Sequence, residues 1–254
     1  MRSAESNDPP ISVVGRVAAV LGALEGADTP LGISELATRT GLAKGSVHRL
    51  VGQLVDERLL ERTPDGRLVL GVRLFEIGSS VPLPRSLSQV ARPLMVDLHQ
   101  ATERQVHLAT LDGIDVVYIE IVRGQGPRLT SQVGGRLPAH ATGVGKAMLA
   151  YSPRAVLAQR VEAGLPAMTP RTLVTPGALA RNLQDIRTEG TSYDHEESHV
   201  GVSCVAAPVF GADSKIRAAL SVTGPTQRMD LQRLGVAVRT AAFAISRQLR
   251  DADL

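Results

Sequence analysis

The sequence predicts a two-domain α+β fold: an N-terminal winged helix-turn-helix, a linker helix, and a C-terminal domain with an antiparallel sheet and flanking helices. Three observations predict it. Residues 32–70 combine two short helical patterns, a glycine turn and a hairpin; residues 78–84, GSSVPLP, form a joint rich in proline and glycine; residues 85–254 mix strand and helix patterns. A chain of 254 residues that is 43% hydrophobic can fill two cores.

The first domain contains three helical patterns. Residues 11–26 place apolar side chains at helical spacing, and a short helix follows that Ser34 is expected to cap. Thr40-Gly41 supplies the tight turn before the next helix. That helix must bury Val47, Leu50, Val51 and Leu54. Its outer face then carries donors for phosphates and base edges, namely Lys44, Ser46, His48 and Arg49.

A β-hairpin follows the helices as the expected wing. Its turn, Thr63-Pro64-Asp65-Gly66, suits type I geometry, and Arg62 and Arg67 flank it within reach of a phosphate backbone. Two amphipathic helices alone are equally typical of a simple bundle, so the hairpin is what favours binding to double-stranded DNA. Residues 39–73 hold seven basic and four acidic side chains, a weak excess that favours a dimer on two half-sites.

Composition excludes several other classes of protein. The single cysteine, Cys204, excludes an internal disulfide and a multi-cysteine zinc site. With no Trp, three Tyr and three Phe, base stacking on single-stranded nucleic acid is disfavoured. The first ten residues are polar, and no run of about 18 apolar residues occurs, so we expect a cytoplasmic protein with no membrane partner.

The patterns divide the chain into residues 1–70, a linker helix and joint at 71–84, and a second domain at 85–254. In the second domain a helix is expected at 86–103 and strands at 105–111, 115–122 and 128–133, with turns at Asp112-Gly113 and Gly124-Gln125-Gly126. Helices are expected at 143–151, 153–163, 176–189 and 230–249, and strands at 202–209 and 216–223.

The string His195-Glu196-Glu197-Ser198-His199 matches the HExxH pattern of zinc metalloproteases. That chemistry needs a helix to bring both histidines to one face. Gly190 lies upstream and Val200-Gly201-Val202 downstream, which disfavours a long helix, and the extended metzincin spacing would need Gly where Val202 stands. We therefore expect a solvated loop rather than a zinc site.

Residues 143–147, GVGKA, resemble part of a phosphate-binding loop. The full motif fails, because His140 occupies its first glycine position and Ala147 replaces the Ser/Thr that binds magnesium. Two glycines that open a helix still leave amides suited to a carboxylate. A purely structural cap explains the segment equally well.

Cys204 lies between Val202 and Ala206 on an apolar strand, where a cysteine is more often an ordinary buried residue than a nucleophile. Ser221 and Thr223 share a face of a neighbouring strand, by the alternation of side chains. Together with Asp194 they suggest a small pocket of mild donors and acceptors. The alternative is a cytoplasmic enzyme that uses Cys204 or a metal held by His195 and His199.

Taken together, these segments resemble the IclR family of bacterial transcriptional regulators. Four motifs carry the resemblance in order: LAKGSVHRL at 42–50 with Asp65-Gly66-Arg67 and Leu70-Gly71; GRLPAHATGVGKA at 135–147; residues 190–208, which end in GVSCVAAP; and SVTGP at 221–225. The match covers nearly the whole chain. Family members usually have an acidic stretch at the position of residues 195–199, which accounts for that string.

The resemblance implies a GAF-like C-terminal effector domain, double-stranded operator DNA and a small organic acid effector as partners, and a homodimer or homotetramer without catalysis, metal or cofactor. Carried over position by position, the effector contacts are the backbone amides of Gly143 and Val144 and the side chains of Asp194, Cys204, Ser221 and Thr223. Ala43 and Gly45 depart from common family residues on the recognition helix, which implies an unusual operator preference. A ligand-binding module that has lost operator binding is the other alternative.

Overall fold

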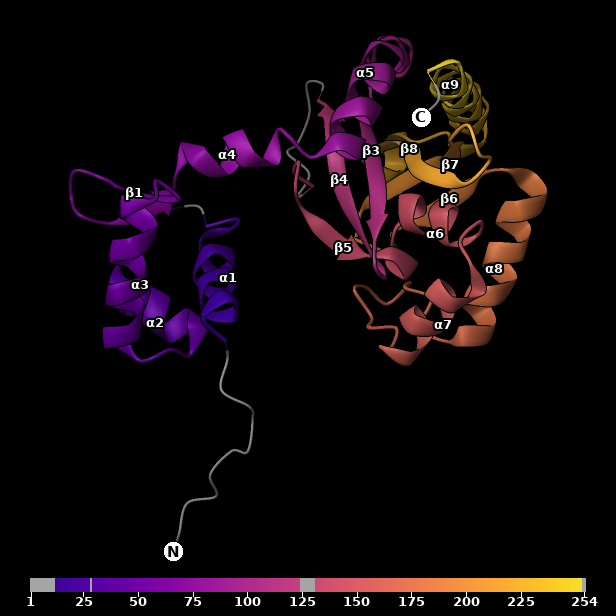
Figure 1. Ribbon diagram of the computed structural model, residues 1–254. Coiled ribbons are helices and arrows are strands. Elements are labelled where there is room, and N and C mark those ends of the chain that lie inside the picture. The colour runs from indigo at the N-terminus through magenta and orange to yellow at the C-terminus, as the bar shows by residue number, and fades with distance from the viewer. Residues whose placement is uncertain (1–11, 28, 124–130, 253–254) are drawn as a thin grey trace, which may run out of the picture. The chain divides into compact units, whose positions relative to one another are not determined.

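The computed structural model describes residues 12–27, 29–123 and 131–252. The chain divides into two compact units, Met1–Val81 and Pro82–Leu254, which are described separately below (Figure 1). The boundary falls in the joint that the sequence marks with proline. No helix in the described ranges combines the length and apolar character needed to cross a membrane.

The first unit is a winged helix-turn-helix, as predicted. Its elements are α1 (Val13–Leu24), α2 (Ile33–Thr40), α3 (Lys44–Asp56), β1 (Leu60–Arg62), β2 (Leu68–Leu70) and α4 (Val72–Gly78). The core is aliphatic, and the four residues expected to be buried on α3 are all in it. β1 and β2 pair antiparallel, and Gly66 N–H donates to the Thr63 carbonyl at 2.8 Å across the wing turn.

The start of α2 differs from the prediction. The helix begins at Ile33, and the residue before it, Gly32, donates its N–H to the Glu35 carboxylate at 2.8 Å. Ser34 therefore lies inside the first turn and does not cap the helix. The turn after α2 has the expected left-handed residue, Gly41, with φ of 68°.

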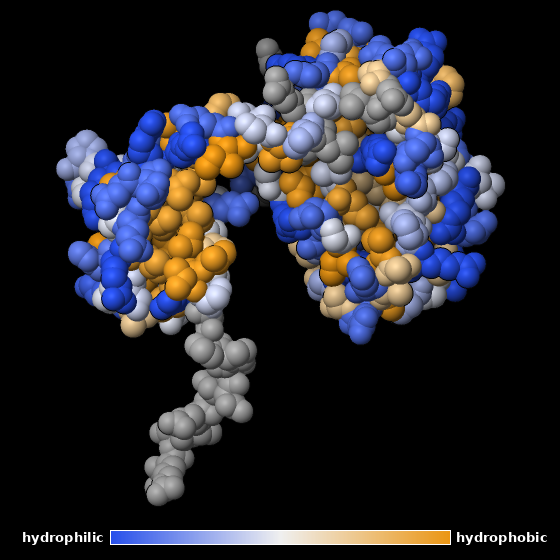
Figure 2. Space-filling view, viewed as in Figure 1, coloured by the Kyte–Doolittle hydropathy of each residue, from blue (hydrophilic) through white to orange (hydrophobic). Residues whose placement is uncertain are grey.

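Apolar side chains lie exposed on the first unit. Hydrophobic colour gathers over α1 in Figure 2, where Val13 and Val14 are 58% and 77% exposed. α4 exposes Val72, Phe75 and Ile77. Contiguous exposed apolar side chains are typical of surfaces that bind another chain.

The second unit is an α+β domain with one six-stranded antiparallel sheet in the order β5-β4-β3-β8-β7-β6. The strands are β3 (Gln105–Asp112), β4 (Asp115–Val122), β5 (Arg136–Pro138), β6 (Ser192–His195), β7 (Val202–Phe210) and β8 (Ile216–Pro225). Helices α5 (Pro82–Thr102) and α9 (Leu231–Asp251) pack on one face of the sheet. Helices α6 (Gly143–Leu149), α7 (Arg154–Glu162) and α8 (Pro176–Glu189) contribute to the core on the other face. β7 is buried along almost its whole length because helices cover both of its faces.

Three details of the second unit differ from the prediction. Pro82 begins α5 instead of standing in a loop, since proline is compatible with the first turn of a helix. The expected strand at 128–133 and turn at 124–126 fall partly or wholly outside the described residues; residues 131–133 are not a strand, and β5 forms at 136–138 instead. β6 was not expected, because four residues are too few to show alternation.

Candidate functional site

The outer face of α3 is polar and available for contact. Lys44, His48 and Arg49 are exposed, and Ser46 is half-buried. Within the described ranges, no ion pair or side-chain hydrogen bond holds the three exposed residues. Ala43, which precedes the helix, offers no side-chain cap to the first backbone amides of α3. This face therefore presents cationic and donor groups that are free to bind a partner.

The two wing arginines differ in their partners. Among the described residues, Arg62 donates a hydrogen bond to the Gly66 carbonyl alone, at 3.3 Å. Arg67 donates to the Pro30 carbonyl at 3.0 Å, and its guanidinium lies 3.5 Å from Glu35 and 3.6 Å from Asp65. Arg67 therefore helps to fix the wing against the segment before α2, and part of its charge is already compensated.

The second unit contains a partly open cavity of about 250 Å³ on the α6 side of the sheet. Five of the six predicted effector contacts line it: Gly143, Val144, Asp194, Cys204 and Thr223. The sixth, Ser221, is buried but does not line the cavity. The remaining lining comes from β3, β4 and β5, from the ends of β7 and β8, from Thr142 before α6, and from Ser131 and Ser198–Gly201. It includes His107, Tyr118, Leu137, Thr142, His199 and Val202.

Strand register brings the predicted polar residues together. Asp194 on β6 lies opposite Cys204 on β7, and Cys204 lies opposite Thr223 on β8, so these three residues form a row across the sheet. Ser221 lies on the same face of the sheet, two positions before Thr223 on β8 and opposite Ala206 on β7. The Ser221 and Thr223 hydroxyls both lie beside the Cys204 thiol.

Burial controls the chemistry of this row. Burial, followed by the Asp194 charge, raises the pKa of Cys204 to about 12, so the sulfur stays a protonated thiol and a poor nucleophile. Burial also raises the pKa of Asp194 to about 6, against hydrogen bonds from Ser198 and the Glu197 amide that lower it. The row can exchange hydrogen bonds with a ligand, and it lacks the activated nucleophile that the enzyme alternative needs.

The two glycines that open α6 are required by packing. A Cβ on Gly143 would lie 2.9 Å from the Cys204 sulfur, and one on Gly145 would overlap the Ala139 carbonyl oxygen. Thr142 caps the helix through a bond from the Gly145 amide at 3.0 Å. The glycines thus allow α6 to lie close to β7 at the cavity wall.

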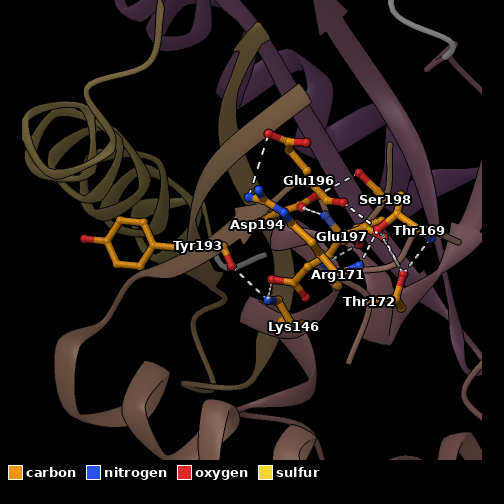
Figure 3. Close-up of polar contacts among 11 residues, drawn as sticks. Lys146, Thr169, Arg171, Thr172, Tyr193, Asp194, Glu196, Glu197 and Ser198 are labelled. Atoms are coloured by element: carbon orange, nitrogen blue, oxygen red, sulfur yellow. Dashed lines mark hydrogen bonds and ion pairs between the residues drawn. The ribbon is translucent and has the colours of Figure 1, made fainter. Parts of the chain in front are cut away.

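Lys146, the lysine of the partial phosphate-loop motif, points away from the cavity into the core. Its ammonium group lies 2.5 Å from the Glu197 carboxylate and donates to the Tyr193 carbonyl at 2.8 Å. The two side chains are 0% and 7% exposed. Figure 3 shows Lys146 next to Glu197 and to the main chain of Tyr193.

The residues from Glu196 to Gly201 are here called the 196–201 loop, and its second part, Ser198–Gly201, lines the cavity. Asp194 accepts from the Glu197 amide at 2.6 Å and from the Ser198 hydroxyl at 2.8 Å (Figure 3). From the other side Thr169 donates to the Glu196 carbonyl at 2.6 Å, and Thr172 to the Glu197 carbonyl at 2.7 Å. These bonds and the buried ion pair fix the loop.

The HExxH string forms a loop, as expected. β6 ends at His195, and Glu196 and Gly201 adopt positive φ of 64° and 78°, which no helix allows. His199 lines the cavity, while His195 does not. Among the described residues no group of three or more His, Cys, Asp or Glu side chains is placed to hold a metal ion.

Sequence reasoning missed His107 and Tyr118, whose rings meet edge to face 5.4 Å apart at the cavity. Burial lowers the pKa of His107 to about 4, so the imidazole is neutral. Its two nitrogens lie 3.4 Å from the Thr223 hydroxyl and 3.3 Å from the Ser131 hydroxyl. A lone histidine in the apolar run at 105–111 was the available signal.

Comparisons with known proteins find the same family along nearly the whole chain. The IclR helix-turn-helix domain matches residues 13–64, and the bacterial transcriptional regulator IclR C-terminal domain matches residues 84–247. The regulator XynR of Escherichia coli is 34% identical over 247 residues, which cover 95% of this chain and 98% of XynR. A crystal structure of an IclR homolog from Microbacterium hydrocarbonoxydans in complex with 4-hydroxybenzoate aligns with a TM-score of 0.86 at 29% identity, over 94% of this chain and 100% of the homolog. The Thermotoga maritima IclR structure aligns with a TM-score of 0.75 at 27% identity, over 93% of this chain and 98% of that one.

Proposed function

The chain belongs to the IclR family of bacterial transcriptional regulators, and we propose that a small organic acid held in its cavity changes its affinity for operator DNA. The cavity carries this proposal, because it combines an apolar wall with the Asp194, Cys204 and Thr223 row. The homolog with bound 4-hydroxybenzoate supports an organic acid as the class of effector. Relatives are named as regulators and repressors, which are not enzymes.

We assign the effector contacts to the row and to the start of α6. Asp194, Cys204 and Thr223 exchange hydrogen bonds with the polar edge of the ligand, and Gly143 and Val144 approach it through the backbone. Ser221 acts one layer deeper, through the Cys204 thiol beside it. Leu137 and Val202 supply the apolar wall.

DNA recognition is assigned to the first unit. Lys44, Ser46, His48 and Arg49 face the major groove from α3, and Arg62 and Arg67 hold the wing on the phosphate backbone. Residues 1–70 bind DNA, residues 71–84 join the two parts, and residues 85–254 bind the effector. The protein acts in the cytoplasm, where bacterial DNA lies.

A homodimer or homotetramer is the proposed binding form. The first unit has only a small basic excess, and a second copy doubles the phosphate contacts. The exposed Val72, Phe75 and Ile77 of α4 offer an apolar face for this contact. Since ligand and DNA bind different units, the ligand acts by favouring one arrangement of the oligomer.

A gel-shift experiment tests the proposal. The full chain is titrated against the intergenic DNA upstream of its own gene, alone and with a panel of acids: 4-hydroxybenzoate, benzoate and short 2-oxo acids. We expect a shifted complex that an excess of random DNA displaces only poorly. At least one acid should change the affinity of the protein for this DNA. Absence of a specific shift contradicts operator binding, and a specific shift that no acid alters contradicts the effector class.

A further inference from the structure

The charge of the cavity conflicts with the charge of an organic acid. Among the described residues that line it, Asp194 is the one carboxylic acid, and none is Lys or Arg. Asp194 is 2% exposed. Two carboxylates brought together in a buried site repel each other strongly, and such pairs relieve the repulsion by sharing one proton.

We propose that Asp194 selects the protonation state of the effector: an organic acid binds beside it only together with one proton, which the two carboxyl groups then share. The inference rests on the proposed function, because it needs an organic acid in the cavity. The balance is simple. The ligand carboxylate and the Asp194 carboxylate take up one proton from solvent, no bond to carbon changes, and the complex carries one negative charge where two would repel.

The geometry leaves room for this role. Each Asp194 oxygen already accepts one bond from its own loop, the Glu197 amide on Oδ1 and the Ser198 hydroxyl on Oδ2. A carboxyl oxygen has a second lone pair, so either atom can still hold a shared proton. Hydrogen bonds of the O–H to O⁻ kind are short and strong, which compensates for burying the ligand's charge.

Other charged groups near Asp194 do not remove the conflict. The Lys146 charge lowers the pKa of Asp194, yet its ammonium is paired with Glu197 and does not line the cavity. Glu197 adds a negative charge that raises the pKa of Asp194 further. From β7 and β4 the facing groups are the Cys204 thiol and the Tyr118 phenol, both neutral because burial raises their pKa values.

Two histidines, His107 and His199, line the cavity. His107 on β3 stays neutral because its pKa is about 4, lowered by burial and then by the charge of Arg123, which lies just after β4. His199 in the 196–201 loop is exposed at the cavity wall. His199 is thus a second cavity-lining group that carries a ring nitrogen, so the experiment must separate it from Asp194.

The expected pH dependence follows from linkage. Above the Asp194 pKa of about 6, the free protein holds an ionised carboxylate, so binding must take up a proton and affinity falls about tenfold per pH unit. Below that pKa, Asp194 is already protonated and the dependence disappears. The slope is therefore expected between about pH 6.5 and 8, and not between about pH 5 and 5.5.

Calorimetry on the full chain tests the inference. Each acid of the panel, 4-hydroxybenzoate first, is titrated at pH 7.5 in two buffers with different ionisation enthalpies, which gives the protons taken up per ligand bound. The affinity is then measured from pH 5 to 8. We expect uptake near one proton for wild type, near zero for Asp194→Asn, and near one for His199→Gln and for the matched loop variant Glu196→Gln. The neutral probe 4-hydroxybenzamide should bind with no pH dependence.

The outcomes separate the two claims. An acid that binds wild type without proton uptake overturns the inference and leaves the proposed function standing, and this holds even if Asp194→Asn fails to fold. Proton uptake that persists in Asp194→Asn but disappears in His199→Gln assigns the proton to His199. This result also overturns the inference about Asp194. No binding of any panel acid between pH 5 and 8 overturns the proposed effector class and the inference together.

Discussion

Replacing Lys146 by methionine should destabilise the second unit severely. The ammonium group is fully buried, 2.5 Å from Glu197 and 2.8 Å from the Tyr193 carbonyl. Without it the Glu197 charge stays buried with no cation, and removing one partner of a buried pair costs about 3–5 kcal/mol. Many domains have only about 5–15 kcal/mol of stability, so this is a large share.

The double variant Lys146→Met/Glu197→Leu should recover much of that loss. An apolar pair of similar volume often replaces a buried ion pair without net cost. The Tyr193 carbonyl would still lack its donor, which leaves a residual loss of about 1–3 kcal/mol. The double variant is therefore expected to be more stable than the single Lys146→Met protein.

Urea unfolding followed by tyrosine fluorescence measures these effects in the correct unit. The chain has no Trp, and its three tyrosines, Tyr118, Tyr151 and Tyr193, all belong to the second unit. Lys215→Met is the matched control: its salt bridge to Asp213 is 76% exposed on the lysine side, so a change below about 1 kcal/mol is expected. A loss under 1 kcal/mol for Lys146→Met, or a double variant no more stable than the single one, would refute the reasoning.

The remaining predictions concern DNA and the thiol. His48→Ala and Arg49→Ala should each weaken operator binding by about 1–3 kcal/mol in fluorescence anisotropy and change affinity for random DNA much less, if both touch base edges; equal losses on both DNAs would assign them to the backbone. Arg67→Ala should weaken all sequences alike and reduce the salt slope, because a wing arginine contacts the phosphate backbone, which is the same in every sequence; a sequence-selective loss would contradict this. Cys204→Ser should leave ligand-free operator affinity unchanged in gel shifts while altering ligand affinity, and a loss of DNA binding without ligand would show that the thiol has another role.

Sequence patterns predicted the elements best where one physical rule acts over many residues. The helical spacing of Val47, Leu50, Val51 and Leu54 was enough to orient α3, and the whole set is buried. The short strand β6 was not predicted, because its four residues form a strand through their pairing with β7 and are too few to show alternation of side chains. The cap of α2 was misassigned because Gly32 and Glu35 form a capping contact where Ser34 looked sufficient.

The candidate cavity was predicted less completely, for a physical reason. Asp194, Cys204 and Thr223 could be grouped from strand alternation and family resemblance. His107 and Tyr118 lie far from them in sequence, and only the pairing of β3 with β8 brings that side of the cavity to the row. The pairing of Lys146 also escaped prediction, because its partner Glu197 lies 51 positions later in the chain and only the fold brings the two together in the core.

The pairing of β3 with β8 also sets an order of events during protein synthesis. It aligns Ala109 with Ala219, and next to this pair the Thr110 hydroxyl donates to the Arg217 carbonyl, 107 positions away, so the cavity cannot form until β8 has left the ribosome. The first unit is complete at Val81 and needs none of those later residues. At bacterial elongation rates of about 5–20 residues per second, a nascent chain therefore carries a folded DNA-binding unit for on the order of ten seconds before its ligand-responsive part exists.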